Sequence, residues 1–228
     1  MLAEKPLTAV LDAFASSDPT PGGGSAAALM GALGASLLAM VAALPKTKTG
    51  APEERQALDA ARDALLRARD ELVGLIDRDA AAYDLVVAAY RKPKTTDEEK
   101  AARAAAIQDA LRVATEVPVE TVRACATAID QARAVAQYGN PSARSDVAVG
   151  IQTLMVAVQS AMFNVEANIG SLKDPAIVEQ ITENLRALQR TMQGAGETIF
   201  KDANLIELYT NMAKRLGSTH GQDTKGVL

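Results

Sequence analysis

The sequence predicts an all-α protein, a single-domain helical bundle built around a buried helix of small residues. The chain has 228 residues, of which 48% are apolar and only 3% aromatic, and it contains no Trp. Alanine is abundant, and this composition favours closely packed helices over a β-sandwich, which would need more β-branched and aromatic residues. Apolar residues recur at helical spacing along most of the chain. No stretch alternates convincingly with the period of two that a half-buried strand would show.

The central helix is predicted from the stretch PTPGGGSAAALMGALGASLLAMVAAL, residues 19–44, which carries no charged residue. A membrane span is the alternative, since residues 25–44 reach the ~20 residues that a bilayer crossing needs. Roughly half of them are Ala, Gly or Ser, and no aromatic or basic residue flanks the run, so we expect a core helix and no membrane contact. A ridge of small residues should make a tight helix–helix contact, within the subunit or across a dimer interface. Its members are Ala27, Gly31, Ala35, Ala39 and Ala43.

Helical patterns also occupy most of the remaining chain. The first expected segments are residues 4–16 and residues 52–90. The next helix begins at a capping box of Thr96 and Glu99, is kinked or ended by Pro118, and is followed by a further helix to about residue 137. Residues 147–172 and a last pair of helices from Asp174 and Pro175 complete the prediction. We expect one domain over residues 1–216. Residues 217–228 are small and polar and are expected to form a disordered tail.

Charge, cysteine and histidine content exclude several classes of function. A net charge of −4 at pH 7 argues against a nucleic-acid surface, which needs a basic excess. The single cysteine, Cys125, cannot form an internal disulfide or a thiolate cage for zinc or an iron–sulfur cluster. The only histidine, His220, lies in the tail, which excludes a His-based zinc site, a Ser-His-Asp triad and a Cys-His pair. The N-terminus lacks the pattern of a secretory signal, so we expect a cytoplasmic protein.

Proton transfer near neutral pH would therefore depend on carboxylates, lysines or tyrosines with altered pKa values, acting on an activated substrate. One group of candidates lies in the stretch of residues 77–94, which contains Asp79 and Asp84 and ends in Lys92 and Lys94. The alternative is a solvated surface face whose basic end suits the helix dipole. Asp84, however, lies among Ala and Val, and a carboxylate buried there would need a partner.

The glycines before the central helix, Gly22, Gly23 and Gly24, are followed by Ser25. They form either a turn that leads into the helix with Ser25 near its cap, or a surface of exposed N–H groups that binds an anion or a polar ligand edge. The residues alone do not separate these two interpretations. A Walker loop is excluded because no Lys-Ser/Thr pair follows, and no strand precedes the glycines as a dinucleotide fingerprint requires.

Two further groups of polar residues have both a structural and a ligand-binding interpretation. The stretch GNPSARSD offers Asn140, Ser145 and Asp146, of which the last two can cap the following helix. Asn164 and Asn168 lie four residues apart on an otherwise apolar helix. Buried amides either tie helices together or bind the polar edge of a ligand.

Five stretches in this order resemble a known family. They are PTPGGGSAAALMGALGASLLAMV, DRDAAAYDLVVAAYRKPK, ATEVPVETVRACATAI, GNPSARSDVAVG and NVEANIGSLKD. The ordered set is similar to the folate cyclodeaminase/cyclohydrolase family, which comprises the cyclodeaminase half of formiminotransferase-cyclodeaminase and the free-standing methenyltetrahydrofolate cyclohydrolases. The resemblance covers residues 5–205. It implies an all-helical subunit, a homodimer, a tetrahydrofolate derivative as the substrate, no metal and no further cofactor.

The resemblance implies an enzyme of folate one-carbon metabolism. The first expectation is a cyclohydrolase that converts 5,10-methenyltetrahydrofolate to 10-formyltetrahydrofolate. The alternative is a cyclodeaminase that converts 5-formiminotetrahydrofolate to 5,10-methenyltetrahydrofolate and ammonia. A third reading is a helical binding or scaffold protein that kept the fold and lost the activity.

By the same resemblance, Asp79, Asp84 and Lys92 are the candidate catalytic residues. The expected substrate-binding residues are Gly22, Gly23, Gly24, Ser25, Lys94, Asn140, Ser145, Asp146, Asn164 and Asn168.

Overall fold

Every regular element is a helix in the part of the chain that the structure describes. The computed structural model describes the backbone of residues 1–202, with the side chains up to Arg190 and that of Met192. The elements in chain order are the 3₁₀ helix η1 (Leu2–Glu4), α1 (Leu7–Phe14), α2 (Gly23–Ala43), α3 (Pro52–Tyr90), α4 (Asp97–Tyr138), the 3₁₀ helix η2 (Pro141–Ala143), α5 (Arg144–Ile169) and α6 (Pro175–Asp202). The predicted all-α bundle is confirmed.

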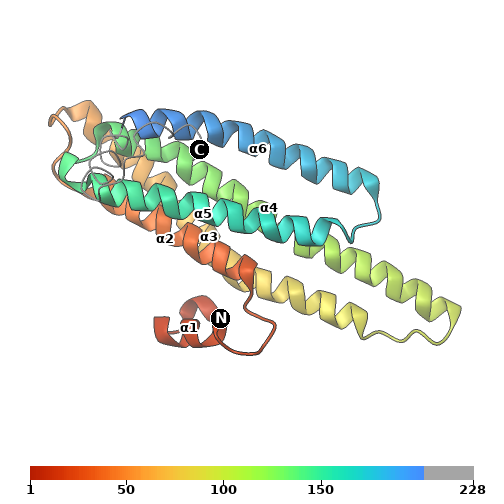
Figure 1. The fold of residues 1–228 in the computed structure, drawn as a ribbon. Helices are drawn as coiled ribbons and strands as arrows, with labels where there is room; N and C mark the ends of the chain where they lie inside the picture. Colours follow the sequence, from red (N-terminus) through yellow and green to blue (C-terminus); the bar gives the residue numbers. More distant parts are fainter. Residues whose placement is uncertain (203–228) are drawn as a thin grey trace, which may run out of the picture.

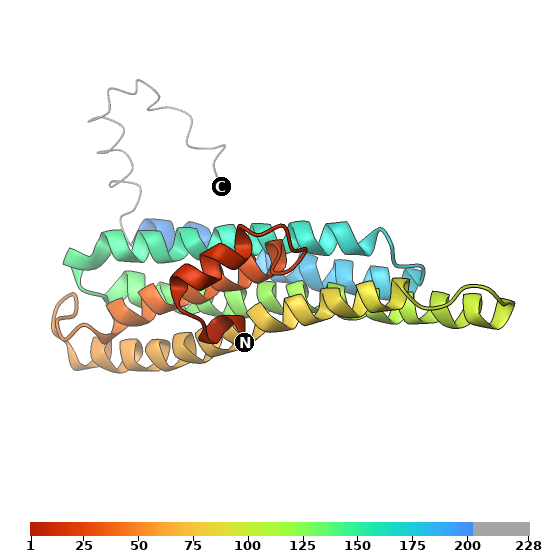
Figure 2. The same cartoon turned by 90° about the horizontal axis from the view of Figure 1, so that it is seen from below.

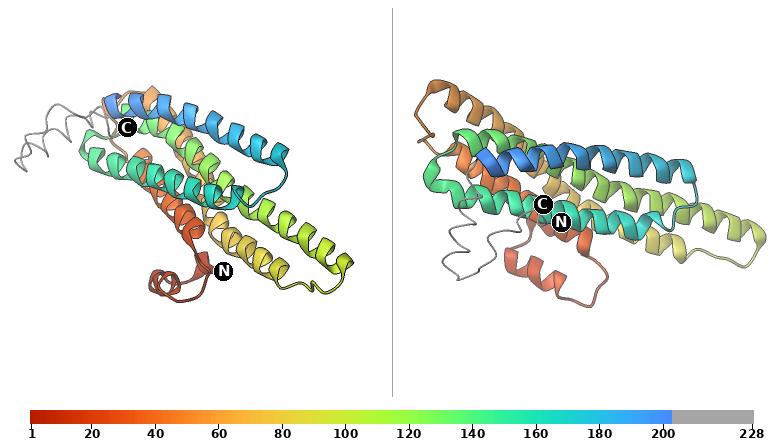
Figure 3. Two further views of the ribbon diagram at one scale, coloured as in Figure 1. Left: turned by 45° about the vertical axis from the view of Figure 1, so that its right-hand side comes forward. Right: turned by 45° about the horizontal axis from the view of Figure 1, so that its top comes forward.

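Helices α2 to α6 form an elongated bundle (Figure 1). α2 lies inside it and packs against α3, α5 and, less extensively, α4, while α6 packs on α4. The hairpin of α3 and α4 extends beyond the other helices at one end, as the view from below also shows (Figure 2). α1 lies outside the bundle, beside the start of α2 (Figures 1 and 3).

The ridge of small residues on α2 makes its tight contact inside the subunit. Ala27 and Ala35 are fully buried, and Ala39 is 4% exposed. A β-carbon at Gly31 would lie 2.8 Å from Sγ of Cys125 and 3.0 Å from Cδ2 of Leu72, so glycine lets α2 approach α4 and α3 closely. Of the two contacts that the sequence left open for this ridge, the structure has the one within the subunit. A dimer contact through it is excluded.

Two glycines set the spacing between α2 and α5. A β-carbon at Gly34 would lie 2.8 Å from the carbonyl oxygen of Gly150, and one at Gly150 would lie 3.2 Å from the carbonyl oxygen of Gly34. The backbones of the two helices therefore touch with no side chain between them. α2 and the segment Pro141–Ile169 are both long and apolar enough to cross a membrane, a property that core helices of globular proteins share. In α2, 56% of the most apolar window is buried in the bundle.

Pro118 does not end its helix, contrary to one of the two outcomes expected from the sequence, because α4 continues through it to Tyr138. Proline has no N–H, so the carbonyl of Ala114 four residues earlier loses its usual partner. The side chain of Asn168 on α5 supplies one: its Nδ2 donates to the Ala114 carbonyl at 2.9 Å. This bond satisfies the orphaned carbonyl and ties α5 to α4.

Several expected boundaries differ from those observed. The single helix expected over residues 4–16 is divided into η1, which ends at Glu4, and the shorter α1, which begins at Leu7. The division lies at Lys5, which is held in an extended conformation because it precedes Pro6. The capping box of Thr96 and Glu99 is confirmed at the start of α4. The last pair of helices is represented by α6 alone, and its second member, His220 and the expected tail over residues 217–228 lie outside the described residues.

Candidate functional site

The first turn of α2 meets the middle of α3 at Asp79. The hydroxyl of Ser25 donates to Oδ2 of Asp79 at 3.0 Å and also lies 2.9 Å from the carbonyl oxygen of Ile76. The backbone N–H of Ser25 donates to the same carboxylate. Ser25 is fully buried, so its side chain positions Asp79 and is not free to bind solvent. Ser25 thus lies in the first turn of α2, next to the carboxylate.

Glycine at position 24 is required by the position of this carboxylate. A β-carbon there would collide with Asp79, whose carboxyl group occupies the space that any larger residue would fill. The helix begins at Gly23 with Gly22 as its cap residue, so unpaired N–H groups of the first turn lie beside the carboxylate. The turn that leads into the helix is confirmed, and the binding of a ligand by its N–H groups stays a prediction.

Burial raises the pKa of Asp79, and this effect exceeds the opposing effect of the two hydrogen bonds from Ser25. A carboxyl group with a raised pKa is a stronger base when ionised, and it holds its proton at higher pH than an ordinary aspartate. Perturbed carboxyl groups of this kind are suited to general acid–base chemistry. Asp79 is therefore the candidate acid or base of the site.

Asn164 on α5 lies on the other side of the glycine turn. A β-carbon at Gly23 would lie 3.3 Å from Nδ2 of Asn164, so the amide lies against the glycine backbone. Nδ2 donates to the carbonyl of Ser160 one turn earlier, at 2.8 Å. Oδ1 accepts from no donor among the described residues and remains available to a ligand. Gly22, Gly23, Gly24, Ser25, Asp79 and Asn164 thus form one group, contributed by α2, α3 and α5.

Asp77 was not predicted as a site residue, but it holds the N-terminal segment against α3. Its carboxylate accepts the backbone N–H of Leu2 at 2.5 Å and that of Ala3 at 3.4 Å. A contact between residues so far apart in sequence leaves no local signal, so the pattern of the chain could not have revealed it.

Asp84, Lys92 and Lys94 do not join this group within one subunit. Asp84 lies five residues after Asp79, which places it on a different side of α3, and it is exposed. Lys92 follows the end of α3 and is about 20 Å further along the helix axis than Asp79. Both lysines are exposed in the loop at the tip of the α3–α4 hairpin.

Asn140, Ser145 and Asp146 lie at the opposite end of the bundle. Asp146 and Asn164 are separated by about 27 Å along α5, because eighteen residues of helix lie between them. Oδ1 of Asn140 accepts the N–H of Ser142 at 2.9 Å and caps η2. Ser145 and Asp146 lie inside the first turn of α5 and do not cap it, since η2 leads directly into the helix and Ala143 is the cap residue. The structure also assigns Asn168 to the Ala114 carbonyl, away from the glycine turn.

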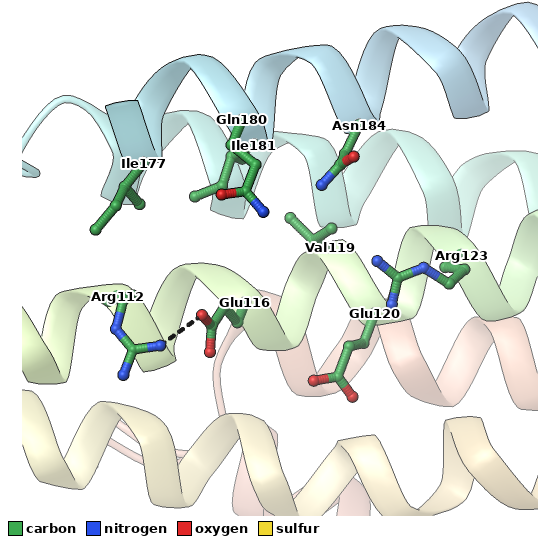
Figure 4. Close-up of a pocket in the computed structure, with 9 residues that line it drawn as sticks. All are labelled: Arg112, Glu116, Val119, Glu120, Arg123, Ile177, Gln180, Ile181 and Asn184. Atoms are coloured by element: carbon green, nitrogen blue, oxygen red, sulfur yellow. Dashed lines mark hydrogen bonds and ion pairs between the residues drawn. The ribbon is translucent and has the colours of Figure 1, made fainter. Parts of the chain in front are cut away.

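A separate hollow of about 480 Å³ lies between α4 and α6 (Figure 4). Its charged side chains are largely paired: Arg112 with Glu116 at 2.8 Å, and Glu120 with Arg78 of α3. Arg78 points toward α4 while its neighbour Asp79 points toward α2, so this hollow and the candidate site are on different sides of α3. No group of three or more His, Cys, Asp or Glu side chains in the described part of the chain could hold a metal ion.

Comparison with known proteins identifies the family. The formiminotransferase-cyclodeaminase family profile matches residues 6–187, which is most of the chain. The chain belongs to the formiminotransferase-cyclodeaminase family.

Relatives within the family have two activities in their names. A methenyltetrahydrofolate cyclohydrolase of Methylorubrum extorquens is 40% identical over 201 residues, which are 88% of this chain and 97% of the relative. A formimidoyltransferase-cyclodeaminase of Sus scrofa is 34% identical over 187 residues, 82% of this chain but only 35% of that longer protein. The formiminotransferase-cyclodeaminase fold is also found in the crystal structure of formiminotetrahydrofolate cyclodeaminase from Thermotoga maritima. The superposition covers 90% of this chain and 99% of the Thermotoga maritima chain, with a TM-score of 0.80 and 24% sequence identity.

Proposed function

We propose that this protein is a methenyltetrahydrofolate cyclohydrolase, which hydrolyses 5,10-methenyltetrahydrofolate to 10-formyltetrahydrofolate. The observation that carries the proposal is the half-buried Asp79 carboxyl group with its raised pKa, held by Ser25 beside a glycine-lined helix start. The relative of 40% identity along nearly its whole length supports the same reaction.

The substrate requires little activation, because its bridging carbon is already part of an amidinium cation. A water molecule adds to this carbon as the Asp79 carboxylate removes one of its protons. The bond between the carbon and N5 then breaks, and Asp79 returns the proton to N5. The hydroxyl proton of the adduct leaves to solvent as the formyl carbonyl forms on N10, so one proton is released in each turnover. Asp79 acts as the general base and then as the general acid.

The surroundings of Asp79 fit this role. The free Oδ1 of Asn164 and the N–H groups of the first turn of α2 offer an acceptor and donors for the polar edges of the pterin. Burial excludes water from one side of the carboxylate and strengthens its interaction with a cationic substrate. No metal or further cofactor is needed to make the substrate carbon electrophilic. We propose that the reaction takes place in the cytoplasm.

The cyclodeaminase reaction is the second candidate, and the relative from Sus scrofa favours it. A carboxyl group with a raised pKa can also supply the proton that the departing ammonia takes. Two assays on the intact protein separate the possibilities: the loss of methenyltetrahydrofolate absorbance, and the release of ammonia from 5-formiminotetrahydrofolate. We expect the first to proceed and the second to be slow. Turnover of neither folate would favour the scaffold reading.

We also propose that the protein is a homodimer. Five large apolar side chains are exposed on α2 and α5, two helices that pack against each other, and they are here called the apolar stripe. Its members are Leu33, Met40, Val149, Val156 and Phe163, with Phe163 75% exposed. The members repeat every seven residues on each helix, and large apolar patches exposed on a protein surface commonly mark interaction sites. Light scattering at micromolar concentration tests the proposal, and a monomeric mass would contradict it.

A further inference from the structure

We propose that the part of α3 beyond the start of α2 binds the p-aminobenzoylglutamate arm of the substrate, with Tyr83 stacked on the benzoyl ring and Arg103 bound to the carboxylates at its end. This inference rests on the proposed function. It concerns the half of the substrate that takes no part in the reaction and supplies binding energy.

α2 covers one face of α3 only as far as Asp79. A β-carbon at Gly31 would lie 3.0 Å from Cδ2 of Leu72, and one at Gly24, seven residues earlier, would collide with Asp79, seven residues later. The two helices therefore run antiparallel, and α2 begins level with Asp79. From that level α3 continues for eleven residues to Tyr90, in the hairpin that extends beyond the other helices (Figure 1).

Two tyrosines lie on the continuation of this face, here called the uncovered face. Tyr83, Val86 and Tyr90 follow Asp79 at intervals of four, three and four residues, which keep to one side of a helix. Tyr83 is 43% exposed and Tyr90 is 51% exposed. Only 3% of the chain is aromatic, so two exposed rings on one face form a distinct surface. The hydroxyl of Tyr83 bonds to no other described residue, so its ring is left to interact with a ligand.

The spacing along α3 fits the structure of the substrate. The benzoyl ring is bonded directly to N10, beside the carbon to which water adds. Tyr83 lies about 6 Å from Asp79 along the helix axis, because four residues separate them. With the reacting carbon at Asp79 and the pterin at Asn164 and the glycine turn, the ring lies at the level of Tyr83. Aromatic rings in contact pack in offset-stacked or edge-to-face arrangements, and an exposed tyrosine permits either.

The far end of the uncovered face is cationic. Arg103 of α4 lies over the Tyr90 ring, 5.4 Å from its centroid, and its Nε and Nη2 donate to the Tyr90 carbonyl at 3.2 and 3.1 Å. Its Nη1 has no partner in the described part of the chain and is free to donate to a carboxylate. Lys92 and Lys94 add positive charge in the adjoining loop. Tyr90 lies about 16–17 Å beyond Asp79 along the axis, so the glutamate at the end of the arm approaches this cationic end.

Kinetics of Tyr83 variants test the stacking. Tyr83→Ala should raise KM for methenyltetrahydrofolate about tenfold and leave kcat nearly unchanged, because it removes an interaction present before and during the reaction. Tyr83→Phe keeps the ring and should keep the wild-type KM. Leu85→Ala, exposed on another side of α3, is the matched control and should also keep it. A wild-type KM in Tyr83→Ala, or an equal loss in Tyr83→Phe, would overturn the stacking. A monomeric mass for Tyr83→Ala beside a dimeric wild type would assign Tyr83 to the subunit contact and would also overturn it.

Arg103→Gln tests the charged end. KM should rise about threefold at low ionic strength and less at high ionic strength, since salt screens an exposed charge. Arg67→Gln is the matched control, because Arg67 is exposed on the part of α3 that lies on the other side of Asp79. An unchanged KM in Arg103→Gln at low ionic strength would remove Arg103 from substrate binding.

A protection experiment locates the arm without any turnover. Val86→Cys places a thiol between the two tyrosines, while native Cys125 is buried and should not react. The probe is 5-formyltetrahydrofolate, which has the whole arm but lacks the reactive amidinium. At ten times its Kd it should slow alkylation of Val86→Cys by N-ethylmaleimide about tenfold, whereas Leu85→Cys should react at the same rate with and without it.

The outcomes separate this inference from the proposed reaction. Protection of Val86→Cys without turnover of methenyltetrahydrofolate by the wild type would retain the binding of the arm and discard the reaction. Turnover by the wild type without protection of Val86→Cys would overturn the inference and leave the reaction in place. The absence of both would overturn the two together.

Discussion

The hydroxyl of Ser25 donates a 3.0 Å hydrogen bond to the carboxylate of Asp79 and joins the first turn of α2 to the middle of α3. The same carboxylate fills the space beside Gly24 that any side chain would need. Burial raises the pKa of Asp79, while the hydrogen bonds from Ser25 lower it. The strength of Asp79 as a base therefore depends on the hydrogen bonds from Ser25 and on the burial of its carboxylate beside Gly24. Variants at these two positions can measure the two effects separately.

Replacement of Asp79 with Asn should lower kcat for methenyltetrahydrofolate hydrolysis about 10²-fold or more, the usual contribution of a positioned acid or base. Asp63, exposed on the same helix and outside the site, offers a matched control, and Asp63→Asn should keep the native rate. The measurement is steady-state loss of methenyltetrahydrofolate absorbance, with circular dichroism to confirm that both variants are folded. A fully active Asp79→Asn protein would remove this carboxylate from the mechanism.

The dependence of the rate on pH follows from the raised pKa of Asp79. A general base works only when ionised, so kcat should fall as the pH is lowered through the pKa of this group. That fall should occur above the usual aspartate value of 3.8. Ser25→Ala removes a hydrogen bond that stabilises the ionised form, so the fall should move to still higher pH. Ser36→Ala is the control on the same helix, because its hydroxyl donates to the Ala32 carbonyl within α2, away from Asp79. A profile that Ser25→Ala leaves in place would show that another group controls the rate.

The helices were predictable from the sequence because their signals are local. The uncharged run of α2 and the capping box of Thr96 and Glu99 each depend on residues within a few turns of one another. The composition of the site was not predictable in full. Whether Asn164 or Asp146 lies beside Gly23 depends on the direction in which α5 packs against α2, and helical periodicity is the same in both directions. The contact of Asn168 with Ala114 likewise depends on which helix lies opposite Pro118.

Replacement of Gly24 with Ala should impair catalysis without a large loss of helix. The new methyl group would collide with the Asp79 carboxylate and displace it from Ser25. We expect kcat to fall at least tenfold, since proton transfer depends on the position of this group. Gly74→Ala is the control: a β-carbon there meets nothing within 4 Å, and the change should stabilise the protein by roughly 0.5–1 kcal/mol. Equal rates for the two variants would contradict the close contact at Gly24.

Asn168→Ala should destabilise the protein through the carbonyl of Ala114. That carbonyl has no helical partner because of Pro118, and removal of the amide would leave it without its donor. An unsatisfied buried acceptor costs about 1–3 kcal/mol, and the value should lie toward the lower end because Ala114 is only partly buried. Urea unfolding measures the change. The double variant Asn168→Ala/Pro118→Ala restores an N–H at residue 118, so it should recover part of the loss, and an unchanged loss would refute the link between the two residues.

The last prediction concerns a buried carboxylate far from the site. Glu54, only 7% exposed, accepts hydrogen bonds from Thr47 and Thr49 and from the N–H of Gly50, and thereby holds the loop between α2 and α3. The hydrogen bond from the Thr47 hydroxyl contributes most, and together they lower the pKa of Glu54 from 4.5 to about 2.

A lowered pKa in the folded state means that the ionised form stabilises the fold. This stabilisation is complete above the unfolded value of 4.5 and is lost as the pH falls toward 2. Glu54→Gln should therefore lower Tm at pH 7 and should show a smaller decrease in Tm between pH 5 and pH 2 than the wild type. Glu53→Gln, at the exposed neighbouring position, should follow the wild-type curve. Parallel Tm curves for Glu54→Gln and the wild type across this range would show that Glu54 titrates as an ordinary exposed glutamate.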